Sequence, residues 1–213
     1  MTDHTEAYFT AASSAVTLLA NPAVAAAWTE PSALADMTVG GLAVHLAGQV
    51  TGLPPLLTGA PATEQVVRVL DHYDRAAWIN SGHDSEANTG IRRNGETGAA
   101  DGPEALVART ESALTMLRGV LATTPGDRPM RMPFWGPYSL TLDDFLTTRM
   151  MEIAVHSDDL AASVDVATPD LPHEVVDTVV DLLSRLAVLR HGPTAVLRAL
   201  TRAERAPATI AAF

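Results

Sequence analysis

The chain has 213 residues, of which 47% are hydrophobic and 5% aromatic, so it can bury one sizeable core with a small appendage. It contains no cysteine, and all 14 of its Lys+Arg residues are arginine. These absences exclude disulfides, thiolate metal ligands, a cysteine nucleophile, a Schiff-base lysine and a P-loop. A formal net charge of −11 argues against nucleic-acid binding, because neutralising phosphates requires a basic surface.

The same composition indicates a soluble, helical protein. No continuous apolar run approaches the length of a membrane span, and the start Met-Thr-Asp-His-Thr-Glu lacks the basic segment of a signal peptide. We therefore expect a cytoplasmic protein without a membrane partner. The many Ala and Leu residues and the few aromatic ones favour helices over sheet, and no stretch alternates strongly enough to indicate an α/β fold.

Apolar spacing predicts a series of helices separated by breaks rich in proline and glycine. The first run is interrupted at Asn21-Pro22, because proline kinks or ends a helix. Thr38, Asp101 and Thr141 are expected to be N-caps. In chain order, the expected helices cover residues 4–27, 38–52, 63–81, 101–123, 141–168, 172–191 and 193–201. Four long helices that share an apolar interior predict an all-α four-helix bundle with additional C-terminal helices.

Two connections are predicted to be loops. Residues 82–102 form a polar stretch with several glycines, which is too hydrophilic to pack, and residues 125–137 are irregular. Polar segments at the end of a bundle can move as lids over a site. We therefore predict a cavity between the candidate site and the loops at 82–102 and 134–138. Within the expected helix 63–81, Tyr73, Ala77 and Trp78 share the inward side.

Glu152, His156 and His45 are the strongest candidates for function. Glu152 and His156 stand four apart in a helical segment, so both side chains project from one face. His45 lies among apolar residues of another predicted helix. Two imidazoles and one carboxylate can hold a divalent metal with a position left open for water or substrate. Zinc is the expected ion, with nickel or iron as alternatives. The simpler interpretations are that Glu152 and His156 form a solvated pair and that His45 is a buried core histidine.

Four further residues are candidates for the same site. Asp159, one turn after His156, can orient that histidine or be a surface carboxylate. Arg149 can bind a substrate carboxylate or pair with Glu152. Trp135 and Tyr138 can wall the mouth of the pocket or cap the core. Surface positions are expected for His72, His83, His173 and His191.

These residues resemble the mycothiol-dependent maleylpyruvate isomerase metal-binding family of the DinB-like superfamily. The resemblance covers roughly residues 5–165 and implies a bundle whose metal is held by one His of the second helix and by a Glu and a His of the fourth. By residue match, those ligands are His45, Glu152 and His156. We expect residues 1–165 to form the DinB-like bundle and 166–213 a short helical extension packed on it. The resemblance is carried by Trp28, Pro31, Ser32, the run 38–47, Arg149, Glu152, His156, Asp159 and Leu160.

The resemblance implies a thiol-dependent enzyme. Mycothiol would be the thiol co-substrate, and the metal would lower its pKa for attack on a small electrophilic substrate. The activity would be an S-transfer or an isomerisation, with Arg149 and Asp159 as catalytic residues and Trp135 and Tyr138 contacting the cofactor. A hydrolase using metal-activated water and a non-catalytic metal-binding or ligand-binding bundle are the alternatives, and a monomer and a homodimer are both open.

Two features depart from the family pattern. Gly41 stands three residues after Thr38, where an acidic residue is usual, so we expect a looser start of that helix. In place of the separate C-terminal domain of the full-length isomerase, we expect only one or two helices. This difference weakens the specific substrate assignment more than it weakens the metal site.

Overall fold

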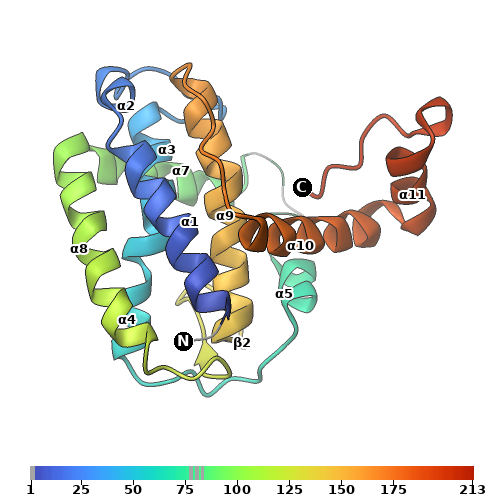
Figure 1. Ribbon diagram of the computed structural model, residues 1–213, viewed down its shortest axis with the longest axis horizontal. Coiled ribbons are helices and arrows are strands. Elements are labelled where there is room, and N and C mark those ends of the chain that lie inside the picture. Colours follow the sequence, from blue (N-terminus) through green and yellow to red (C-terminus); the bar gives the residue numbers. More distant parts are fainter. Residues whose placement is uncertain (1–2, 77–78, 80–81, 83) are drawn as a thin grey trace.

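The fold is a four-helix bundle, described by a computed structural model for residues 3–76, 79, 82 and 84–213 (Figure 1). The bundle consists of α1 (Asp3–Leu19), α3 (Val39–Thr51), α8 (Pro103–Leu121) and α9 (Leu142–Ser163). Helices α1 and α3 each pack against both α8 and α9. Their shared interior contains fully buried side chains from all four helices, among them Tyr8, Leu42, Leu117 and Phe145. The predicted all-α bundle is confirmed.

Local sequence explains where the helices begin. The Thr38 hydroxyl accepts the N–H of Gly41 at 3.0 Å, and the Thr141 hydroxyl accepts the N–H of Asp144 at 3.1 Å, as N-caps do. Both predicted caps are therefore confirmed. Asn21 ends the first run by capping the short α2 (Pro22–Ala26).

The predicted cap at Asp101 is wrong. The N-cap of α8 is Gly102, whose φ of 83° lies in the left-handed region that glycine tolerates. The Asp101 carboxylate instead accepts a hydrogen bond from Arg109 at 3.2 Å.

The connections at the lower end of Figure 1 form a small sheet. Between α8 and α9, the strands β1 (Pro129–Met130) and β2 (Leu140–Thr141) pair antiparallel. The short helix α4 (Leu53–Thr58) follows α3 earlier in the chain. Val66 bridges Ser139 next to the two strands, which makes the chain before α5 (Val69–Arg75) extended. The expected helix 63–81 is therefore shorter than predicted at both ends, because α5 also stops at Arg75, after which Ala76 is extended. Ala77 and Trp78 lie outside the described residues.

The predicted loop at 82–102 is wrong for most of its length. Residues Glu86–Ala99 form the helix α7, which packs along α3. Its glycines allow the approach: a Cβ on Gly95 would lie 2.7 Å from the carbonyl oxygen of Gly41, and one on Gly98 would lie 2.7 Å from a methyl of Val44. Two of the glycines that indicated a loop, Gly95 and Gly98, are helix–helix contact points. The predicted mobile lid over this range stays a prediction.

Helix α7 also supplies the acidic group that Gly41 lacks. Glu96 accepts the backbone N–H of Thr38 at 2.8 Å and the Thr38 hydroxyl at 3.0 Å. In a capping box, an acidic residue three positions after the cap makes the first of these bonds. Here a side chain from another helix makes it, so the expectation of a looser helix start is wrong.

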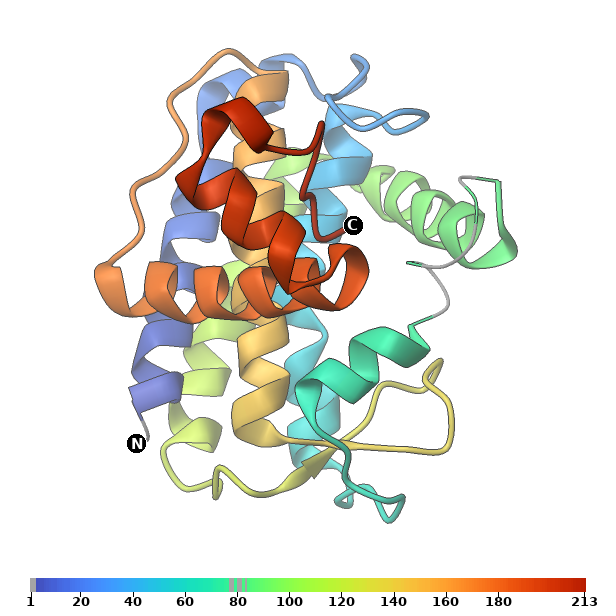
Figure 2. The same ribbon diagram turned by 90° about the vertical axis from the view of Figure 1, so that its right-hand side faces the viewer.

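The C-terminal part adds α10 (His173–His191), α11 (Pro193–Thr201) and a 3-10 turn at Ala203–Arg205. Helix α10 packs against α9, α1 and α5 and lies across the bundle in Figure 2. The last residues return toward the bundle, where the rings of Phe213 and Tyr73 lie 5.8 Å apart. The additional helices are confirmed, and the domain division near residue 165 stays a prediction. No described helix combines the length and hydropathy needed to cross a membrane.

Candidate metal centre

The two neighbouring helices α3 and α9 bring the three predicted ligands together. Glu152 and His156 extend from one face of α9, one turn apart, and His45 extends toward them from the middle of α3. One ligand atom from each lies within 4.8 Å of the other two. The three side chains are 14 to 22% exposed, so the cluster is accessible from solvent yet largely enclosed.

The spacing of the donor atoms fits a single ion. Glu152 Oε2 lies 3.2 Å from His156 Nε2 and 3.6 Å from His45 Nε2. Two ligands that each lie about 2.1 Å from a tetrahedral ion are about 3.4 Å apart. The imidazole rings are edge to face, with centroids 4.6 Å apart. Two nitrogens and one oxygen suit zinc and the other borderline divalent metals.

Both ring nitrogens of His156 face a carboxylate. Nδ1 lies 2.9 Å from Asp159 Oδ2, and Nε2 lies 3.2 Å from Glu152 Oε2. A neutral imidazole has one N–H, so it would turn a lone pair toward one of these oxygens. Protonation of the ring relieves that repulsion, and so does a cation between Nε2 and Oε2. In the neutral tautomer whose Nδ1–H faces Asp159, the Nε2 lone pair is directed to the centre of the site.

The charges of the cluster are coupled. Burial by itself would raise the pKa of Glu152, but hydrogen bonds from His156 and His45 and the charge of Arg149 hold that pKa well below its ordinary value. Burial would likewise lower the pKa of His156, but its bonds to Asp159 and Glu152 outweigh burial and raise the pKa to about 9. An ionised carboxylate at this position provides the negative charge that a divalent cation requires.

Arg149 does not pair with Glu152, although it precedes it by one turn. Its Nη1 donates to Gln49 Oε1 at 2.6 Å, its Nε donates to the Thr148 hydroxyl at 3.1 Å, and its guanidinium lies over the ring of Phe145. No ion pair joins Arg149 to a carboxylate of the described residues. The predicted helix ion pair is therefore not formed, and the alternative, binding of a substrate carboxylate, stays a prediction.

Trp135 and Tyr138 pack together beside α5. Their rings are stacked with centroids 5.8 Å apart, and the Tyr138 hydroxyl lies 3.1 Å from Nδ1 of His72. Tyr138 is buried and Trp135 half-buried, so both contribute to the core. Their predicted contact with a cofactor stays a prediction.

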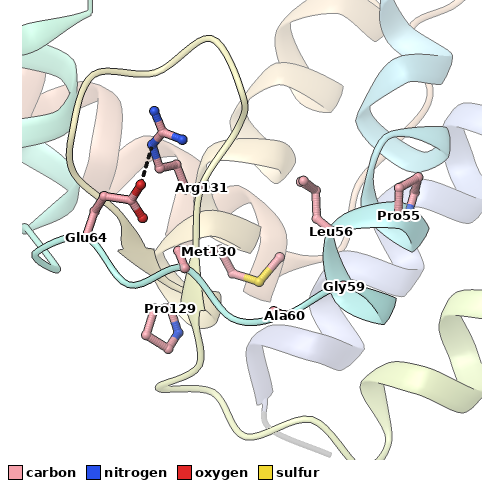
Figure 3. A pocket seen from close by; sticks show the side chains of 9 residues that line it. Pro55, Leu56, Gly59, Ala60, Glu64, Pro129, Met130 and Arg131 are labelled. Carbon is pink, nitrogen blue, oxygen red and sulfur yellow. Dashed lines mark ion pairs between the residues drawn. The ribbon is translucent and has the colours of Figure 1, made fainter.

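Two cavities are found elsewhere, and neither is lined by a candidate metal ligand. One, of about 230 Å³, lies between α1, α5, α9 and α10. The other, of about 200 Å³, lies between α4 and β1, where Glu64 and Arg131 form an ion pair of 3.6 Å at its edge (Figure 3). The predicted cavity between the candidate site and the loops at 82–102 and 134–138 therefore stays a prediction.

The sequence of this chain matches a known protein family. Residues 9–161 match the model of the family described as "Mycothiol maleylpyruvate isomerase N-terminal domain". The chain belongs to this family. The family is named for an enzyme, and its match spans both helices that carry the candidate ligands. No curated protein matches the chain.

Solved structures of this family share the fold. A crystal structure of the mycothiol-dependent maleylpyruvate isomerase aligns with a TM-score of 0.55 and 17% identity, over 87% of this chain and 68% of that one. A histidine-to-alanine mutant of the isomerase aligns with a TM-score of 0.53 and 16% identity over the same shares. At this identity the likeness concerns the fold alone.

The surface positions predicted for the other histidines are only partly correct. His72 is buried, and burial together with the charge of Arg149 lowers its pKa to about 4. The sequence contained a signal for this: Val69, His72, Tyr73 and Ala76 follow the spacing of one helix face. His173 is exposed. His191 is half-buried and contacts the Ala211 carbonyl oxygen at 2.8 Å, and His83 lies outside the described residues.

The residue that pattern reading missed altogether is Gln49. It is buried and lies one turn after His45 on α3, where it contacts Arg149. Its only sequence signal was a lone amide on an otherwise apolar helix face.

Proposed function

We propose that this protein is a mycothiol-using isomerase that requires a divalent metal bound by His45, Glu152 and His156. The observation that carries the proposal is the convergence of these three side chains from α3 and α9 at the spacing of one coordination sphere. Family membership supports the thiol and the reaction class, since the solved relatives are mycothiol-dependent maleylpyruvate isomerases.

The absence of cysteine fits an external thiol. The chain has no thiol of its own, so a thiol-dependent reaction needs a low-molecular-weight thiol as co-substrate. When bound, a divalent metal supplies positive charge that lowers the pKa of a nearby thiol or water. We propose zinc as the ion, because two imidazoles and one carboxylate with an open position form a catalytic zinc ligand set.

The chain's own residues would orient the reactants. Asp159 holds the N–H of His156 on Nδ1, so that Nε2 keeps its lone pair for the metal. Arg149 forms no ion pair with a carboxylate of the described residues, and it would bind an anionic group of the substrate. Trp135 and Tyr138 would form the apolar wall on the side of α5.

An isomerase cycle on this site is chemically balanced. A thiolate adds to one carbon of a substrate double bond, the π electron pair moves to the other carbon and the electron-withdrawing group attached to it, and the remaining single bond can rotate. The thiolate then leaves with the electron pair of the bond it formed, and the double bond returns in the other configuration. No atom is gained or lost, so the thiol acts as a catalyst.

Titration calorimetry with mycothiol would test the proposal. We expect metal-loaded protein to bind mycothiol and to isomerise maleylpyruvate, and metal-stripped protein to do neither. His45→Ala should behave like stripped protein, whereas His173→Ala, which alters an exposed histidine, should behave like wild type. Mycothiol binding that is equal with and without metal would contradict metal dependence. Hydrolysis without thiol would instead indicate a hydrolase.

A further inference from the structure

Gln49 makes a hydrogen bond at each end of its buried side chain. It is 4% exposed and lies on α3, one turn after His45. Its Nε2 donates to the carbonyl oxygen of His45 at 2.9 Å, and its Oε1 accepts from Arg149 Nη1 at 2.6 Å. Its own carbonyl oxygen accepts the buried Tyr8 hydroxyl at 3.0 Å. The residue therefore joins α3 to α9 and α1 directly beside the candidate ligands.

The chemistry of the partners determines which way the amide points. A backbone carbonyl such as that of His45 only accepts hydrogen bonds, and a guanidinium only donates them. The NH2 of Gln49 must therefore face His45, and its oxygen must face Arg149. This oxygen is neutral, so it holds the guanidinium in place without cancelling its charge.

Without that bond, Arg149 has an obvious alternative partner. Glu152 lies three residues later on the same helix, which is the spacing at which opposite charges pair across a helix surface. In the structure, Arg149 contacts Gln49, Thr148 and the Phe145 ring instead. Glu152 is contacted by the two histidines. The position of Arg149 thus decides whether the Glu152 carboxylate is shared with a cation of the chain.

We propose that Gln49 is a positioning residue that prevents an ion pair between Arg149 and Glu152. This separation leaves the Glu152 carboxylate to the metal and the Arg149 charge to a carboxylate of the substrate. The inference rests on the proposed function, because Gln49 can have this role only if Glu152 binds metal. It adds a residue outside the ligand set that controls both metal affinity and anion recognition.

A double-mutant cycle tests the separation directly. Gln49→Met keeps the length of the side chain but removes both hydrogen bonds. Arg149 should then move to Glu152 and lower zinc affinity about tenfold, measured by competition with a chromophoric chelator. Arg149→Gln removes the competing cation, so adding Gln49→Met to it should cause no further loss. Gln65→Met, which changes an exposed glutamine, is the matched control.

The outcomes separate this inference from the proposed function. A tenfold loss in Gln49→Met that persists in the Arg149→Gln background would mean that Gln49 only supports the fold, and it would overturn the inference. Unchanged zinc affinity in Gln49→Met would also overturn it. Wild-type protein that binds no zinc would overturn both proposals. Circular dichroism of each variant shows that the bundle remains folded.

A charge substitution tests the second half of the inference. Gln49→Glu places a carboxylate against Arg149 and should neutralise it. We expect KM for an anionic substrate to rise about tenfold, while kcat and metal content change little. A tenfold fall in kcat with unchanged KM would contradict a role for Arg149 in anion binding that depends on Gln49.

Discussion

The two sides of α3 meet their neighbours in opposite ways. Toward α7, contact is made through glycine, with the backbone of Gly41 opposite Gly95 and Val44 opposite Gly98. Toward α9, contact is made through polar side chains, among them His45 and Gln49. The close backbone contact with α7 fixes the position of α3 by steric fit. The other side can then carry polar groups that contribute little to packing.

The energetic consequences of the two contacts differ as well. The glycine contact is steric, and it fails when a side chain is added. The polar contact is electrostatic, and its carboxylate and imidazoles require a cation or protons to balance them. Changes on the α9 side should therefore alter metal binding and activity, whereas changes on the α7 side should alter stability. The following experiments test this division.

Glu152→Ala should have the largest effect. Removing the only acidic ligand leaves two histidines, so metal affinity should fall more than about a hundredfold and turnover should be lost. The bundle should remain helical, because its apolar core does not involve this side chain. Elemental analysis measures the metal content and circular dichroism the helicity. Glu111→Ala, on the exposed side of α8, is the control. Equal metal content in mutant and wild type would refute the proposed site.

Asp159→Ala should have a smaller effect on the same side. Without its bond to Nδ1, His156 loses the partner that orients it, and metal affinity should fall about 10- to 100-fold. The neighbouring Asp158→Ala removes an exposed carboxylate of the same charge and should change metal affinity little. Chelator competition distinguishes them. Similar losses in both variants would point to a general charge effect.

Gly95→Ala should act on stability. The added Cβ would lie 2.7 Å from a backbone oxygen of α3, so α7 must move and unfolding free energy should fall by about 1–3 kcal/mol. Gly90→Ala lies on the same helix with no atom within 4 Å, and it should stabilise by about 0.5–1 kcal/mol. Urea unfolding monitored by circular dichroism measures both. If Gly95→Ala lowered metal affinity and left stability unchanged, it would contradict the claim that changes on the α7 side act on stability alone.

Glu96→Ala should have the smallest effect. It removes the carboxylate that caps Thr38 from α7, and a lost N-terminal cap costs about 1 kcal/mol. We expect a lower urea midpoint with unchanged metal content. Glu86→Ala, at the beginning of the same helix and away from Thr38, is the comparison. A midpoint equal to that of wild type would show that the bond contributes nothing to α3.

The local features of this protein could be predicted from sequence because they depend on spacing along one helix. Glu152 and His156 share a face since four residues make just over one turn. Thr38 and Thr141 cap helices because their hydroxyls accept N–H groups a few residues away. The bundle itself followed from long amphipathic runs, and family membership confirms it.

The tertiary structure decided the contacts between helices. The glycines of α7 indicate a loop when the sequence is considered alone, and two of them, Gly95 and Gly98, become contact points because α3 lies against them. Glu96 caps a helix 58 residues away, and Gln49 meets Arg149 across 100 residues. No local pattern encodes such pairs, because they depend on how whole helices are placed by the burial of their apolar faces. The sequence thus determined which residues could hold a metal, and the packing of α3 on α9 determined that they meet.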